Sequence, residues 1–184
     1  SSDDSSYTLD VAVRAAQCQI GATRCDPDGN IEICNTARVW EDQQVCVFGC
    51  QNTSCVAPDV SVSSSPGLTI NDSLPPQTDT LSVSGCSTID AITIDVDINH
   101  TYIGDLTVEL TSPSGTSLML HDGTGYSNND IIGTYPTTLS VDGSGSLSDL
   151  VGETGNGTWS MTVNDSVGGD SGTWNSWAVN LNCQ

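Results

Sequence analysis

The sequence predicts an all-β protein in which a small disulfide-rich module precedes an antiparallel β-sandwich. Six of the eight cysteines are crowded between residues 18 and 55. From residue 66 onward, short runs of apolar residues alternate with polar ones, and clusters of Gly, Pro and Ser separate these runs. Alternation with a period of two between turn signals is typical of antiparallel strands, and no stretch shows the spacing of an amphipathic helix.

The first 16 residues are polar except for Leu9, Val11 and Val13, whose alternation predicts one short strand or a linker. The chain starts with a polar run rather than a signal peptide, so we expect it to be the mature or excised part of a secreted protein. No apolar run approaches the roughly 20 residues that a membrane-spanning helix needs.

Residues 17–55 form the predicted disulfide-rich module. An even number of clustered cysteines without paired Cys-x-x-Cys spacing indicates disulfides formed in an oxidising compartment rather than a zinc site. A module of this size cannot bury enough apolar area to fold alone, and three disulfides of about 2–4 kcal/mol each would replace the missing core. The sequence does not choose among the pairings of its cysteines, which are Cys18, Cys25, Cys34, Cys46, Cys50 and Cys55.

Residues 56–65 are predicted to be a linker that runs into a first strand, and residues 66–184 are predicted to form a sandwich of about eight strands. The alternating runs are Ile92–Ile98, Leu106–Leu110, Leu118–Leu120, Trp159–Val163 and Trp177–Leu181. Cys86 and Cys183 would tie the first strands of this domain to its last. Trp159, Trp174 and Trp177 are most simply packing residues of the core and of the sandwich edge. Alternation places Trp177, and not Trp174, with the core residues Val179 and Leu181, and the alternative for Trp174 is an exposed ring that binds a partner or a sugar.

The charge of the chain excludes two classes of partner. Asp and Glu number 23 against three basic residues, which are Arg14, Arg24 and Arg38, and the net charge is −20. Nucleic acids and anionic membrane surfaces need cationic groups to neutralise their phosphates, so neither is an expected partner. Residues 56–184 hold fifteen carboxylates and no Lys or Arg, and these carboxylates must therefore face water, backbone amides or metal ions.

Two long motifs in the second half of the chain resemble a known family. The first runs from Asp97 to Thr116 and includes His100, Gly104 and Asp105; the second runs from Gly157 to Trp177 and includes Trp159, Asp165 and the turn 169–172. Together they resemble the P domain, or Homo B, which follows the catalytic domain in kexin- and furin-like proprotein convertases and in many bacterial secreted proteases. The resemblance covers residues 66–184 and implies a jelly-roll-like β-sandwich in which His100, Gly104, Trp159 and Trp177 are hallmark positions.

The resemblance also implies a function. A P domain stabilises or regulates an adjoining subtilisin-type or zinc-type catalytic domain and has no catalytic residues of its own. The cysteine module is similar to short cysteine-rich units of secreted multidomain proteins from some soil and marine bacteria. We therefore expect a non-catalytic accessory part of a secreted peptidase, most simply a serine-type one. The alternative is an extracellular module that recognises protein or polysaccharide surfaces with no peptidase attached.

The residues themselves offer little for catalysis. Gly169-Asp170-Ser171-Gly172 matches the nucleophile motif of chymotrypsin-like proteases, but a triad also needs a histidine base beside the serine. The two histidines, His100 and His121, lack that context and do not form a zinc-binding motif. Ser171 is therefore predicted to be a turn residue, and paired-carboxylate hydrolysis has no positive support.

Calcium is the cofactor that the carboxylates favour, because Ca²⁺ takes six to eight oxygen ligands from acidic side chains, amides and loop carbonyls. Three candidate groups are Asp95, Asp97 and Asp105; Asp122 with Asn128, Asn129 and Asp130; and Asp165 with Asp170. The competing interpretation of each is a solvated carboxylate that caps a turn. The stretch Asp26–Asn30 resembles an EF-hand loop superficially, but its early Gly and missing closing Glu predict a hairpin turn instead. For His100 and Asp105, we expect a structural role in which hydrogen bonds brace the loop, and the alternative is a contact with the catalytic domain.

Overall fold

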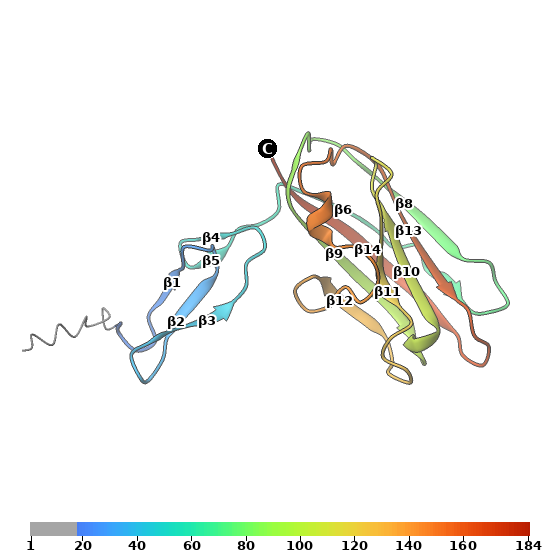
Figure 1. The fold of residues 1–184 in the computed structure, drawn as a ribbon, viewed down its shortest axis with the longest axis horizontal. Helices are drawn as coiled ribbons and strands as arrows, with labels where there is room; N and C mark the ends of the chain where they lie inside the picture. Colours follow the sequence, from blue (N-terminus) through green and yellow to red (C-terminus); the bar gives the residue numbers. More distant parts are fainter. Residues whose placement is uncertain (1–17) are drawn as a thin grey trace, which may run out of the picture.

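A computed structural model describes residues 18–184, and the strand or linker predicted around Leu9–Val13 lies outside these residues. The described chain is almost entirely β-structure, as Figure 1 shows, which confirms the predicted fold class of a β-sandwich preceded by a disulfide-rich module. Within residues 18–184 no helix is long and apolar enough to cross a membrane.

The disulfide-rich module contains two small antiparallel sheets. One is formed by β1 (Thr23–Cys25), β2 (Ile31–Cys34) and β3 (Trp40–Gln44), and the other by β4 (Cys50–Gln51) and β5 (Ser54–Cys55). Three disulfides join Cys18 to Cys34, Cys25 to Cys50 and Cys46 to Cys55. Apart from Ile31, the buried apolar side chains of this module are cysteines, so cystine sulfur occupies the place of a core.

The stretch Asp26–Asn30 is the turn of the β1–β2 hairpin. The backbone N–H of Asn30 donates to Asp26 Oδ1 at 2.6 Å, and Gly29 has a φ of +86°, which only glycine adopts readily. The early glycine that separates this stretch from an EF-hand loop is thus the residue that the hairpin turn requires.

Two sheets pack face to face in the rest of the chain. The five-stranded sheet has the order β12-β9-β14-β6, with β7 also paired to β14, and the four-stranded sheet has the order β11-β10-β13-β8. The bounds are β6 Val60–Ser64, β7 Leu68–Ile70, β8 Gln77–Val83, β9 Ile89–His100, β10 Leu106–Thr111, β11 Ser117–Asp122, β12 Ile131–Tyr135, β13 Gly157–Asp165 and β14 Gly172–Cys183. The first strand, β6, begins at Val60 inside the segment 56–65 that is predicted as a linker, because Val60 and Val62 alternate with serines and pair with β14.

The core lies between the two sheets. Inward-facing residues of β9, such as Ile94, Val96 and Ile98, meet Trp159, Met161 and Val163 from β13, and all of these side chains are buried. The Cys86–Cys183 disulfide joins the segment between β8 and β9 to the end of β14. Because inward and outward residues alternate along most of the long strands, the sequence pattern locates most of this core.

The placement of Trp174 outside the core, which strict alternation predicts, is wrong. Both Trp174 and Trp177 are buried, at 0% and 1% exposure, although they lie three residues apart on one strand. The β14–β9 register shifts between Trp174 and Ser176, which inserts Asn175 as an extra residue and returns both indole rings to the core face. A bulge of this kind breaks the period of two that the sequence interpretation assumes.

Candidate functional site

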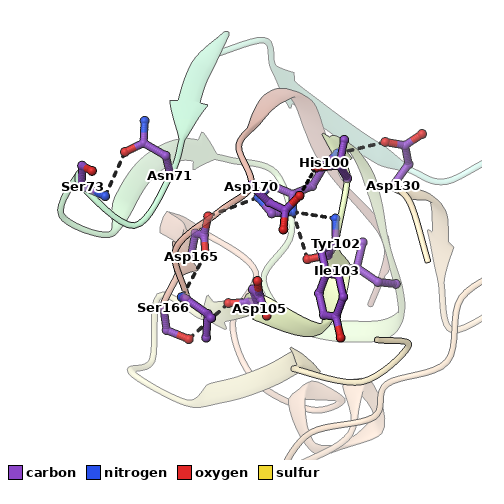
Figure 2. A network of polar contacts seen from close by, with 12 residues as sticks. Asn71, Ser73, His100, Tyr102, Ile103, Asp105, Asp130, Asp165, Ser166 and Asp170 are labelled. Carbon is purple, nitrogen blue, oxygen red and sulfur yellow. Dashed lines mark hydrogen bonds and ion pairs between the residues drawn. The ribbon is translucent and has the colours of Figure 1, made fainter. Parts of the chain in front are cut away.

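The most elaborate polar network of the sandwich surrounds His100, the last residue of β9 (Figure 2). The imidazole is fully buried, with Nε2 3.2 Å from Asp165 Oδ2 and Nδ1 3.0 Å from the carbonyl oxygen of Tyr102. The backbone N–H of His100 donates to Asp130 Oδ1 at 2.9 Å. His100 thus joins β13 to the loop that leaves β9.

Two glycines allow segments of the backbone to approach closely at this end of the sandwich. A Cβ on Gly172 would lie 2.0 Å from the Asn99 carbonyl oxygen and 2.7 Å from the His100 ring. A Cβ on Gly104, in the 3₁₀ turn η1 (Ile103–Asp105), would lie 2.8 Å from both the Tyr102 ring and the Tyr126 Cα. Each glycine stands where a side chain would separate segments that the network holds together.

Three carboxylates, Asp105, Asp165 and Asp170, gather at the same end. Asp165 is buried and accepts from the Val167 N–H through Oδ1, while Asp170 Oδ1 accepts from the Thr101 hydroxyl at 2.6 Å. Partial burial, followed by the negative charges of Asp165 and Asp170, raises the pKa of Asp105, and the nearby His100 lowers it only in part. The site therefore concentrates negative charge around one histidine.

The structure regroups the predicted metal ligands. Asp105 lies beside Asp165 and Asp170 rather than beside Asp95 and Asp97, which are on the outer face of β9. Among the described residues, a different and unpredicted group has the spacing of a metal site. It consists of Asp26, Glu32 and Asp42 of the disulfide-rich module, whose carboxylate oxygens all lie within 4.8 Å of one another. One oxygen of Glu32 is occupied there by Arg24 at 2.7 Å.

The second predicted group also separates into individual contacts. The side chain of Asp130 accepts from the backbone N–H of His100, and the backbone carbonyl oxygen of Asn128 accepts from the Ile103 N–H, so both residues brace the loop. Asp122 and Asn129 are exposed. Individual turn contacts of this kind correspond to the competing interpretation, in which acidic side chains cap backbone amides.

Sequence reasoning missed a second histidine–carboxylate pair. His121 Nδ1 lies 3.0 Å from Asp142 Oδ2, and Nε2 lies 2.9 Å from the carbonyl oxygen of Ile103. Ile103 follows Tyr102, so the two histidines hold consecutive carbonyls of one loop. His121 and Asp142 are 21 positions apart in the sequence, which hides the contact, although the rarity of bases in the sandwich was a signal that each histidine would find a carboxylate.

Ser171 lies exposed in the connection between β13 and β14. The neighbouring His100 uses both ring nitrogens, one for Asp165 and one for Tyr102, and has none to offer a serine hydroxyl. The Gly-Asp-Ser-Gly sequence is therefore a turn that brings Gly172 against His100.

Comparison with known proteins assigns the sandwich. The family model described as the proprotein convertase P-domain matches residues 89–181, which is slightly more than half of the chain. The chain belongs to the proprotein convertase P-domain family. The match runs from the start of β9 almost to the end of β14, so it includes all three carboxylates, both histidines and both tryptophan-bearing strands.

The chain is similar to parts of three longer bacterial proteins. The chain is 33% identical over 123 residues to leupeptin-inactivating enzyme 1 of Streptomyces exfoliatus, covering 66% of this chain and 24% of the relative. It is 36% identical over 104 residues to a calcium-dependent protease of Trichormus variabilis, covering 55% and 15%. It is 39% identical over 89 residues to a transglutaminase-activating metalloprotease of Streptomyces mobaraensis, covering 48% and 10%. The chain thus spans a quarter or less of the length of each relative.

Proposed function

We propose that this chain is a non-catalytic accessory part of a secreted peptidase, in which residues 66–184 stabilise or regulate an adjoining catalytic domain. The observation that carries the proposal is the match of residues 89–181 to the P-domain family model. Two of the three relatives are named as proteases, and this chain covers a quarter or less of each relative. Residues 17–55 would form a separate disulfide-rich module joined through the segment that leads into β6. We favour a serine-type parent of the subtilisin class and keep a zinc-type parent as the alternative.

The structure supports a mechanical role for the P domain. His100, Asp165 and Tyr102 lock the loop after β9 against the end of β13, and the tryptophan-rich core holds both sheets together. A rigid body of this kind stabilises a neighbour through a fixed interface, because little conformational entropy is lost when the two surfaces meet. Four disulfides agree with an extracellular location.

The test is to produce the parent protein with and without residues 56–184. We expect the shortened parent to lose most of its active yield or to be inactivated several-fold faster on heating, with little change in KM for a small peptide substrate. A matched control is Ser171→Ala in the full parent, which should retain full activity. A gene that encodes no peptidase domain beside this chain would refute the proposal.

We also propose that calcium stabilises the sandwich at the end that holds Asp105, Asp165 and Asp170, although their carboxylate oxygens are not gathered within 4.8 Å of one another as those of Asp26, Glu32 and Asp42 are. The donor chemistry fits a hard cation, because these ligands are carboxylate oxygens and no Lys or Arg is present in residues 56–184 to neutralise them. The raised pKa of Asp105 indicates that its charged form is disfavoured there, partly by repulsion that a cation would relieve. Asp105 and Asp170 would hold the ion, while Asp165 keeps its contact with His100.

Thermal unfolding with and without calcium tests this proposal. The midpoint of unfolding should rise by several degrees in millimolar calcium and fall in EDTA, since a ligand that binds only the folded state stabilises it. Asp170→Asn should remove most of this response, and Asp72→Asn, at an exposed carboxylate of the sandwich, should leave it intact. An identical midpoint in calcium and in EDTA would exclude the site.

A further inference from the structure

The outer face of the five-stranded sheet is hollowed into a trough. A cavity of about 430 Å³ lies over strands β6, β9, β12 and β14, on the side opposite the core. Pairing places Asp95 between Thr134 of β12 and Ala178 of β14. In the next row outward-facing Asp97 lies between Ile132 and Ser176.

Small side chains give the trough its depth. Ser63 of β6 pairs with Ala178 of β14, and Ser176 lies two residues before Ala178 on the same strand. The part of the floor over β6 and β14 therefore carries side chains of only one or two heavy atoms. On the opposite side Ile132, at 55% exposure, forms an apolar rim on the edge strand β12. The trough thus has one acidic row of aspartates between a low polar floor and an apolar wall.

A buried polar network fixes the position of Asp95. Its Oδ1 accepts from the Thr134 hydroxyl at 2.6 Å, and its Oδ2 accepts from Asn180 Nδ2 at 2.9 Å. Asn180 is itself buried, at 8% exposure, and is held by Ser61, which donates to its Oδ1 at 2.7 Å. Asp97 Oδ1 similarly accepts from Asn175 Nδ2 at 2.9 Å.

Every donor to these two aspartates is neutral. Amides and hydroxyls orient a carboxylate and leave its negative charge in place, so Asp95 and Asp97 are positioned without being neutralised. Residues 56–184 contain no Lys or Arg, and both histidines are committed to other carboxylates. No side chain of the sandwich therefore supplies a positive charge to Asp95 or Asp97, and a cationic partner would be complementary to them.

We propose that this trough is a docking site for an extended polypeptide segment with basic residues at alternate positions. Asp95 and Asp97 are two residues apart on one strand, so their side chains lie about 7 Å apart on the same face. A bound segment that runs along β9 in extended form would present two Lys or Arg side chains at the same spacing. The next residue of the bound segment after these two basic residues would pack against Ile132. The small residues of the floor leave room for the guanidinium or ammonium groups.

The docking site goes beyond the proposed accessory function and does not depend on it. The occupant is a basic segment of a separate protein, which meets the outer face of the five-stranded sheet in trans. Because Asp95 and Asp97 remain partly exposed to solvent, charge contributes a salt-dependent share of the affinity.

Peptide titration of the full chain tests the proposal. The probe is an eight-residue fluorescent peptide with arginines at its third and fifth positions, and the reference peptide has the same composition with the arginines adjacent. We expect the alternating peptide to bind several-fold more tightly, with binding weakened at least tenfold by the double variant Asp95→Asn, Asp97→Asn. Ala178→Arg, which places a cation in the trough opposite Asp95 and leaves both aspartates unchanged, should block binding as well.

The controls separate a built site from general acidity. The double variant Asp72→Asn, Asp122→Asn removes the same charge from exposed positions elsewhere in the sandwich and should alter affinity less than twofold. Equal losses in the two double variants, or equal binding of both peptides, would overturn the proposal. Displacement of the peptide by millimolar calcium would also overturn it. The same holds if a neutral oligosaccharide binds in the trough and its binding is blocked by Ala178→Arg but not by the aspartate variant. Near-ultraviolet circular dichroism checks that each variant is folded. If the double aspartate variant does not fold, the Ala178→Arg variant still tests the proposal.

Discussion

The two regions of this protein are stabilised by different means. The disulfide-rich module buries little besides Ile31 and cystine sulfur, and three disulfides hold its short strands in place. The sandwich buries a continuous cluster of aliphatic and aromatic side chains between two sheets and contains one disulfide, which joins Cys86 to Cys183. The difference follows from size, since a region of fewer than about 40 residues cannot bury enough apolar surface to fold without covalent links.

This contrast determines how each region should respond to perturbation. Where the stability of a region comes from constraint of the unfolded chain, removal of the covalent link removes the fold. Where it comes from buried area, loss of one link costs a few kcal/mol and the core remains. The predictions below test that distinction.

The largest expected effect is the loss of the module on reduction. A strong thiol reductant should unfold residues 18–55 completely, while the sandwich retains its sheets at room temperature. Two-dimensional amide spectra distinguish the regions, because the signals of β1–β3 should collapse to random-coil positions and those of β9 and β14 should persist. The double variant Cys86→Ala, Cys183→Ala isolates the sandwich disulfide and should lower the stability of the sandwich by about 2–5 kcal/mol without unfolding it. A module that keeps its dispersed signals under reduction would contradict the comparison.

The second effect is a loss of packing in the sandwich. Trp159 is fully buried, and its Nε1 donates to the carbonyl oxygen of Gly155 at 3.0 Å. Trp159→Ala should destabilise the sandwich by about 3–5 kcal/mol because it leaves a large cavity. Trp40 of the module provides the matched control, since its ring is only half-buried and lies 4.2 Å from the Arg24 guanidinium. Trp40→Ala should cost about 1 kcal/mol or less; denaturant titration compares the two, and similar losses would argue against the distinction.

The fold was predictable where alternation is regular. In β13, and in β9 from Ile94 onward, every second residue enters the core, so the polar pattern identifies both the strands and their buried faces. Prediction failed for Trp174, because the bulge at Asn175 changes which residues face inward and leaves no local mark in the sequence. It also fell short at Val60–Ser64, where a short edge strand in a Ser-rich segment resembles a linker.

The candidate site was predictable only in part, since the sequence gives the types of residue but not their partners. The family motifs direct attention to His100 and Gly104, yet the contact between His100 and Asp165 joins residues 65 positions apart. The grouping of Asp105 with Asp165 and Asp170 depends on how the ends of β9 and β13 meet. The Asp26, Glu32 and Asp42 group arises from strand register in the module, which the spacing of the cysteines does not determine.

The third effect concerns a carboxylate that ties two turns of the sandwich. Glu153 accepts from the hydroxyls of Ser112 and Thr116, the former at 2.8 Å. Burial raises the pKa of Glu153, but hydrogen bonds from Thr116, Ser112 and Ser114 together outweigh it, and the pKa ends below its ordinary value. A carboxylate with a lowered pKa in the folded state stabilises the protein above the ordinary value, and this contribution disappears as the pH falls through the folded pKa.

Glu153→Gln should therefore lower the stability of the sandwich by about 1 kcal/mol near neutral pH. The difference from the unsubstituted protein should shrink toward zero as the pH falls well below 4.5, the ordinary value for this side chain. Thermal unfolding between pH 7 and pH 3 measures it, with Glu109→Gln on β10 as the control. A difference that stays constant over this range would mean that the charge of Glu153 does not contribute.

The smallest effect has the opposite sign and tests whether the sandwich tolerates its own charge. Because burial and the charges of Asp165 and Asp170 raise the pKa of Asp105, its ionised form costs stability above the folded pKa, and the cost vanishes as the pH falls and the group is protonated. In EDTA at neutral pH, Asp105→Asn should raise the unfolding midpoint by about 2 °C. The gain should decline on acidification, and in calcium it should reverse, because the variant loses a ligand for the ion. Asp72→Asn should show neither response. A destabilised Asp105→Asn in EDTA would show that Asp105 braces the loop of η1 as a hydrogen-bond acceptor, and the carboxylates of the sandwich would then be structural in the same sense as the cystines of the module.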